Sequence, residues 1–211
     1  MTVSLSSLNS QYYKGVTMLT LKKIKNDQAG FTLVEIAIVM VIIGLLIGGV
    51  LRGQAMIQNA RTKRVVKQAD ELRAAVLTFF DRYNVFPGDE NLPAIPPNGA
   101  DNEGNGNGQI AGAEIFEVFN DLGLAGLISG TYNGTSDRPF HAFGANVDVA
   151  WVDPPPAAAP PAHYIRFFNL PADVCLEIDT KYDDGVFSTG TIVASANYTN
   201  GTNITTLWMQ F

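Results

Sequence analysis

One acidic residue stands inside the longest apolar stretch of the sequence. Glu35 is the only charged residue between Phe31 and Leu51. An ionised carboxylate in an apolar helix is costly unless a cation pairs with it, so a residue of this kind usually has a function. If the chain were cut between Gly30 and Phe31, the new α-ammonium group would lie one helical turn before Glu35, on the same chain or on a neighbouring copy. We therefore expect Glu35 to pair with an ammonium group when copies pack together.

A second group of acidic residues occurs near the C-terminus. Asp179, Asp183 and Asp184 fall within six residues and are followed by Gly185. Carboxylates this close repel one another unless a cation or backbone N–H groups compensate, and hard oxygen ligands suit Ca²⁺. Two interpretations stay open. The three aspartates form a calcium site, or they cap a turn in which Gly185 supplies a positive φ angle. We favour the turn.

The other residues that often carry catalysis are few and scattered. The only cysteine, Cys175, excludes an intrachain disulfide and is expected to be a small buried residue. His141 and His163 lie in sequence flanked by proline and glycine, without metal-ligand spacing, and both are expected at the surface. No Ser/His/Asp, Cys/His or paired-acid arrangement stands out, so we expect no enzymatic activity.

The apolar stretch predicts a membrane helix that continues into an amphipathic one. Phe31–Leu51 contains 21 residues, enough to cross a hydrocarbon core of about 30 Å. Further on, apolar residues recur at spacings of three and four, which is one face of a helix. They are Val65, Ala69, Leu72, Val76, Phe79 and Tyr83. No proline interrupts residues 51–83, so we expect one helix from about Phe31 to Tyr83.

The sequence on both sides of Gly30 resembles a processing site. Lys22, Lys23 and Lys25 precede Gly30, and Phe-Thr-Leu-Val-Glu follows it at the start of the apolar run. This order resembles the leader and cleavage site of type IV prepilins and of the pseudopilins of type II secretion. The resemblance implies that a prepilin peptidase cuts after Gly30, that Phe31 becomes N-methylphenylalanine, and that Glu35 acts in assembly. A signal anchor or cleaved secretory signal is the alternative, disfavoured because no small-x-small cleavage site closes the run.

Two further patches resemble the same family. The sequence Y-N-V-F-P-G-D at residues 83–89 is similar to the family's helix exit, and the run I-D-x-K-x-D-D-G-x-x-x-T-G at residues 178–190 is similar to a segment of many pilin-like proteins. Because major pseudopilins hold calcium in this region, the resemblance supports a calcium site at the three aspartates. Gly44 and Gly48 form a small-xxx-small pair that permits close helix packing.

The expected organisation has four parts. They are a leader over residues 1–30, with Met18 as a possible true start, a transmembrane and assembly helix over 31–52, the amphipathic half of that helix over 53–85, and a globular domain over 86–211. The whole chain has a net charge of −6 and the leader +3, so residues 31–211 carry −9. Such an acidic protein is not expected to bind nucleic acid.

The globular part is expected to have an α+β fold. The pattern predicts a short helix over 113–123, a strand over 164–170, and a second short helix with Pro171 in its first turn and Cys175 among its inward residues. Strands over 191–198 and 204–211 are joined by Asn200-Gly201, a hairpin signal. Residues 131–163 are expected to be loops, with polyproline over 153–161. We expect a small antiparallel sheet packed on the second half of the long helix, as in the pilin fold.

Together these features predict a structural subunit of a type IV pilus or related filament. Its expected partners are copies of itself, other pilins, the prepilin peptidase and an inner-membrane assembly platform. It would sit in the bacterial inner membrane with residues 86–211 in the periplasm, and then join a pilus or a periplasmic pseudopilus. A type II secretion pseudopilin and a membrane-anchored binding domain are the alternatives.

Overall fold

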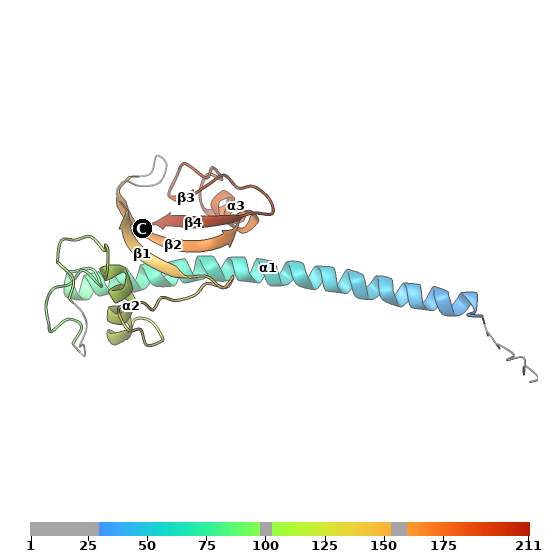
Figure 1. Ribbon diagram of the computed structural model, residues 1–211, viewed down its shortest axis with the longest axis horizontal. Coiled ribbons are helices and arrows are strands. Elements are labelled where there is room, and N and C mark those ends of the chain that lie inside the picture. The colour runs from blue at the N-terminus through green and yellow to red at the C-terminus, as the bar shows by residue number, and fades with distance from the viewer. Residues whose placement is uncertain (1–29, 98–102, 153–159) are drawn as a thin grey trace, which may run out of the picture. The chain divides into compact units, whose positions relative to one another are not determined.

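A computed structural model describes residues 30–97, 103–152 and 160–211 (Figure 1). Its helices and strands, in chain order, are α1 (Leu33–Tyr83), α2 (Glu114–Leu124), β1 (Val147–Val152), β2 (Ala162–Pro171), α3 (Ala172–Tyr182), β3 (Ile192–Ala194) and β4 (Asn203–Gln210). The chain divides into two compact units, with the boundary between Gly48 and Gly49 inside α1. The architecture is α+β, with a long N-terminal helix and a C-terminal domain that contains a small antiparallel sheet.

The first unit, in its described part, is the beginning of α1. Every residue from 31 to 48 is exposed, although most of them are large and apolar. Among the described residues, α1 is the one helix long and apolar enough to cross a membrane. A helix that is apolar on all sides is stable only when lipid or protein covers it, so this unit needs an apolar environment that the chain does not supply.

In the second unit, α1 contributes one face to the core. Its buried residues are Thr62, Val65, Val66, Ala69, Leu72, Ala75, Val76 and Phe79. The predicted apolar stripe is therefore confirmed, with Tyr83 half-buried against the same core. The helix ends at Tyr83, as predicted, and the next residue, Asn84, has a left-handed backbone with φ of 59°. Asparagine tolerates this conformation at the end of a helix, and the following Phe86-Pro87 cannot continue it.

The sheet has four antiparallel strands in the order β1-β2-β4-β3. β2 and β4 form its centre, with Ile165 opposite Met209 and Phe167 opposite Leu207. β3 pairs with β4, so the predicted pairing of the two C-terminal strands is confirmed. β3 is shorter than predicted and ends at Ala194. The chain then leaves the sheet, and the hydroxyl of Tyr198 donates to Asp179 at 2.6 Å before a turn closes at Gly201.

The predicted helices of the domain are confirmed and pack on the same core. α2 buries Val118, Phe119 and Leu122, and α3 buries Val174, Cys175 and Ile178. Together with α1 and the sheet they form one continuous apolar cluster. Pro171 ends β2 and occupies the N-cap position of α3, without a capping side-chain hydrogen bond, so it stands one position before the helix and not in its first turn as predicted.

The expectation that residues 131–163 are all loop is wrong, because β1 lies within this range. Asp148 interrupts the apolar pattern of β1 and conceals it in the sequence. In the structure the Asp148 carboxylate is fully buried and accepts from Arg166 at 2.6 Å and from Arg138 at 3.0 Å. Two guanidinium groups compensate the buried charge, which allows an acid inside a strand. The polyproline prediction falls largely on residues 153–159, which lie outside the described residues.

Candidate functional site

The start of α1 is capped by a reciprocal pair of side chains. The backbone N–H and the hydroxyl of Thr32 donate to Oε2 of Glu35 at 2.8 and 2.9 Å. In return, the backbone N–H of Glu35 donates to Oγ1 of Thr32 at 3.2 Å. This is a capping box, which satisfies N–H groups that have no partner in the first helical turn. Glu35 is therefore held in place by its own helix.

Thr32 is a hydrogen-bonding partner of Glu35 that the sequence prediction missed. A Ser or Thr followed three residues later by Glu, directly before an apolar run, is a known signal for a helix start. Thr-Leu-Val-Glu at residues 32–35 has this spacing. The charge of Glu35 indicates an intermolecular partner, whereas the Thr-x-x-Glu spacing also predicts an intramolecular hydrogen-bond partner. The Thr32 bonds fix the carboxylate beside the N-terminus of the helix.

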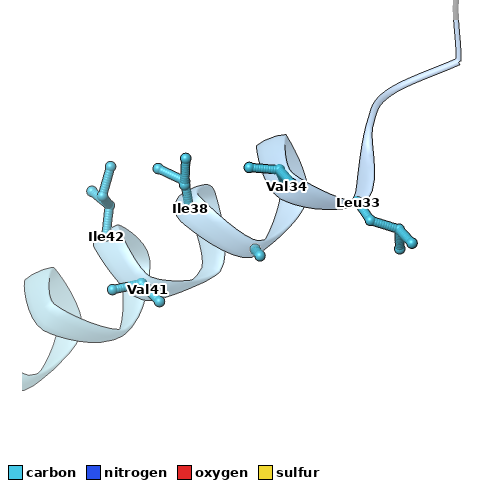
Figure 2. A pocket seen from close by; sticks show the side chains of 6 residues that line it. Leu33, Val34, Ile38, Val41 and Ile42 are labelled. Carbon is cyan, nitrogen blue, oxygen red and sulfur yellow. The ribbon is translucent and has the colours of Figure 1, made fainter.

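An apolar face begins within the capping box, at Leu33 and Val34, and continues along α1. Figure 2 shows Val34, Ile38 and Ile42 projecting from the same side of the helix, with Leu33 and Val41 beside them. These residues line a shallow hollow that is almost entirely apolar, and Ala37 completes it. The arrangement follows from the spacing of four, which places residues one above the other on a helix. It offers a surface on which an apolar helix or lipid chain can pack.

The predicted processing and packing glycines lie in open space. Gly30 precedes α1 and is exposed, and Phe31 has 82% of its surface exposed. A β-carbon added at Gly30, Gly44 or Gly48 would meet no atom within 4 Å. The fold of the single chain therefore places no demand on these glycines. Cleavage at Gly30 and helix packing at the other two stay predictions.

The three C-terminal aspartates come together around the turn that follows α3. One oxygen from each of Asp179, Asp183 and Asp184 lies within 4.8 Å of the others. Each carboxylate also accepts hydrogen bonds within the domain. Asp179 accepts from the backbone N–H of Gly185 at 3.1 Å and Asp184 from that of Val186 at 2.8 Å.

These hydrogen bonds fit the capped turn better than a calcium site. Asp183 accepts the backbone N–H groups of Thr191 and Ile192 at 2.6 and 2.7 Å, which attaches the turn to β3. Burial raises the pKa of Asp179, although the hydroxyl of Tyr198 and the N–H of Gly185 act in the opposite direction. The favoured interpretation of the turn thus agrees with the donors present. The spacing of the oxygens would still admit a cation, and the calcium site stays a prediction.

Both histidines are buried, so the expectation of surface positions is wrong. His141 accepts the backbone N–H of Phe143 at Nδ1 (3.1 Å), and its Nε2 donates to the carbonyl of Phe168 (2.7 Å). His163 accepts the backbone N–H of Ile110 at Nε2 (3.3 Å). Burial lowers the pKa of both rings, that of His163 to about 4. Each ring is a neutral hydrogen-bonding member of the core.

Cys175 is buried as expected, and its surroundings do not favour a reactive thiolate. Burial, with the nearby charges of Asp173 and Asp179, raises the pKa of the thiol to about 12. A nucleophilic cysteine requires the opposite shift.

The comparisons with known proteins concern the N-terminal segment. The model of the prokaryotic N-terminal methylation motif matches residues 25–51, which include Gly30, Phe31, the capping box and the apolar run. No curated protein and no solved structure matches the chain. The match agrees with the resemblance seen in the sequence and is consistent with a type IV prepilin or pseudopilin. The chain therefore carries the prokaryotic N-terminal methylation motif, which supports a structural protein of the type IV pilin and pseudopilin class.

Proposed function

We propose that this protein is a structural subunit of a type IV pilus or related filament. The observation that carries the proposal is the methylation motif at residues 25–51, followed by a helix whose apolar residues are exposed in the single chain. The prepilin peptidase cuts after Gly30 and Phe31 is N-methylated. Until assembly the protein spans the inner membrane once, with the C-terminal domain in the periplasm.

Assembly depends on the first part of α1. Lipid covers this apolar surface before assembly, and the equivalent helices of other copies replace the lipid in the filament. Apolar packing alone has little preference for one register, because lipid tails are as apolar as leucine. Glu35 adds the preference, since its charge is costly unless the α-ammonium group of a Phe31 lies beside it. Gly44 and Gly48 allow neighbouring helices to approach closely.

The capping box contributes to this role by preparing the carboxylate. Both Thr32 donors engage Oε2 of Glu35. A side chain fixed in this way loses less conformational entropy when it meets a partner. The Thr32 bonds therefore position Glu35, and the ammonium group of Phe31 neutralises it.

A pseudopilin of type II secretion is the second candidate, favoured by the close approach of Asp179, Asp183 and Asp184. In that case the three aspartates would hold Ca²⁺, which would bind the turn to the end of α3. Two measurements on the mature protein separate the two candidates. Calorimetry measures the binding of added Ca²⁺, and thermal unfolding measures whether Ca²⁺ stabilises the domain. Binding at sub-millimolar Ca²⁺ with a higher melting temperature, together with loss of secretion on deletion, would favour the pseudopilin. Absence of heat at these concentrations removes the calcium site.

The experiment that tests the proposal is mass spectrometry of the mature N-terminus in protein from its native membrane. We expect the chain to begin at Phe31 with one additional methyl group. An intact leader, or a cut after the apolar run, would remove the basis for the role of Glu35 and leave a membrane-anchored or secreted domain.

A further inference from the structure

A cluster of cations follows the apolar half of α1. Between Leu51 and Asp70 the sequence contains five cations and no acid, namely Arg52, Arg61, Lys63, Arg64 and Lys67. We call these five residues the basic segment. All five side chains are exposed. Within the described part of the chain, only Lys67 has an ion pair, with Glu71 at 3.2 Å.

The rest of the domain has the opposite charge. Residues 70–211 contain 18 acidic and five basic residues, a net charge of −13, whereas the basic segment carries +5. The separation is therefore strong, and the basic segment does not reflect a generally basic protein. This separation along the sequence favours an orientation with the basic segment toward a negative surface, with one acid, Asp173, beside the segment, where it accepts from Gln58 at 2.6 Å.

The exposed side chains of the basic segment are accessible to a partner, although the Arg61 guanidinium lies over the ring of Phe143, 6.0 Å from its centroid. Thr62, Val65 and Val66 of the same helix are buried in the domain core. Lys63 and Arg64 lie between them in sequence but project from the other side of the helix, where they are exposed. The core therefore occupies one face of α1, and the cations occupy the faces that remain open.

Adjacent apolar residues place the basic segment at the edge of a membrane. Met56 and Ile57 lie between Arg52 and Arg61 and are 72% and 57% exposed. Arg61 follows Ile57 by four residues, about 6 Å along the helix. The headgroup layer on each side of a bilayer is about 5–7 Å thick. If Met56 and Ile57 reach the boundary of the acyl chains, Arg61, Lys63 and Arg64 meet the headgroups, and Arg52 extends toward them from within the membrane.

We propose that the basic segment binds the headgroups of anionic phospholipids such as phosphatidylglycerol. This inference rests on the proposed membrane insertion and extends the inserted segment from Leu51 to Ile57. Bound in this way, the domain keeps its positive side on the membrane and its acidic surface away from it until the subunit is assembled. Each cation near an anionic membrane strengthens binding about fivefold, and the attraction weakens as salt rises.

The test uses the full chain in lipid nanodiscs at one copy per disc. Ala60 is exposed and next to Arg61, so Ala60→Cys provides a site for a fluorophore, while the native Cys175 is fully buried and does not compete for the label. A nitroxide on the lipid headgroups quenches the fluorophore when the basic segment lies among them. We expect quenching to rise severalfold when phosphatidylcholine is partly replaced by phosphatidylglycerol, and to return to the phosphatidylcholine level in 1 M salt, where the Debye length is about 3 Å.

Two sets of substitutions separate the basic segment from net charge. The double variant Lys63→Gln, Arg64→Gln, which removes two positive charges as the control does, should lose most of the response to phosphatidylglycerol. The double variant Arg82→Gln, Lys181→Gln changes exposed cations outside the basic segment and should keep it. All these side chains are exposed, so the fold is expected to persist, which circular dichroism checks.

Other outcomes would overturn the inference. Equal quenching in both lipids, or equal losses in the two sets of variants, would exclude specific headgroup binding. A response that appears in neutral lipid only with several copies per disc would assign the basic segment to the acidic surface of a second copy. A chain that does not enter the discs would refute the membrane segment itself, whereas an inserted chain without a lipid response would refute only this inference.

Discussion

The two parts of α1 use the same backbone geometry for different purposes. Ile42, in the first part, is 52% exposed, whereas Val65 and Phe79, in the second part, are fully buried. The first part is apolar on all sides, and the second is apolar on one face only. The second part therefore satisfies its apolar surface within the fold, while the first can satisfy it only with lipid or other proteins. The second part of α1 therefore stabilises the domain, and the first part is available for interactions with lipid or other proteins.

The largest effect is expected on cleavage, from a substitution at Gly30, which precedes the first part of α1. Gly30→Val should abolish cleavage, because the cut that we propose lies directly after this glycine. A β-carbon at position 30 would have no neighbour within 4 Å, so the substitution leaves the fold unchanged. Mass spectrometry of the membrane-bound protein should find the leader intact. Gly53→Ala is the matched control, also in open space, and should be cleaved normally.

A pair of core and surface substitutions tests the division of α1 directly. Phe79→Ala removes a fully buried ring that lies 4.7 Å from the ring of Tyr83. It should reduce the free energy of unfolding of the domain by about 3–5 kcal/mol. Ile42→Ala removes a side chain that the domain does not bury and should leave this free energy unchanged. Urea unfolding in detergent, followed by tryptophan fluorescence, measures both. Similar losses for the two variants would contradict the division.

Periodicity in the sequence was sufficient to predict much of this fold. The stripe from Val65 to Phe79 repeats at helical spacing over four turns, and no other structure would bury it. α2 and the pairing of β3 with β4 were also predicted, because the dense apolar residues of α2 and the Asn200-Gly201 turn are local signals. Where one face must be buried and local signals agree with that face, a single sequence determines the element.

Features that depend on distant partners could not be predicted. β1 was missed because Asp148 is tolerated in a buried strand only through Arg138 and Arg166, which are distant in sequence from one another. His163 was misplaced because its burial depends on the packing of three aromatic rings, Phe86, Trp151 and Phe211. At the candidate site the sequence predicted the important residue but missed its local partner. Glu35 could be predicted because a charge is unusual in an apolar run. Its hydrogen-bond partner Thr32, only three residues away, was missed.

Glu35 gives the next largest effect. Glu35→Ala should be cleaved like the wild type but should reduce filament yield by about 100-fold, because about 3 kcal/mol is lost when an ion pair in an apolar helix is left incomplete. Quantitative immunoblots of sheared filaments and of membranes measure assembly and cleavage separately. Glu71→Gln, which changes an exposed acid in the second part of α1, should assemble normally. Normal filament yield from Glu35→Ala would contradict its role in setting the register.

The smallest effect concerns pH and should be confined to the domain. The pKa of His163 is lowered by burial to about 4 in the folded protein, against about 6.5 in the unfolded chain. Between these values the unfolded chain binds more protons, so stability falls as pH decreases. From pH 7 to pH 5 this histidine should cost about 2 kcal/mol of folding free energy. His141, whose pKa is lowered in the same direction, should add to the loss.

A substitution that cannot titrate isolates the contribution of His163. His163→Gln keeps an oxygen that can accept the N–H of Ile110, which Nε2 of His163 accepts at 3.3 Å. This variant should lose less stability than the wild type between pH 7 and pH 5, even if it is weaker at pH 7. Both proteins contain the same acids, including Asp179, whose pKa burial raises, so the contribution of the acids cancels in this comparison. Equal pH dependence in the two proteins would show that His163 is protonated without cost in the folded state. In that case His163 would not be the neutral ring that accepts a hydrogen bond from the N–H of Ile110 in the folded domain.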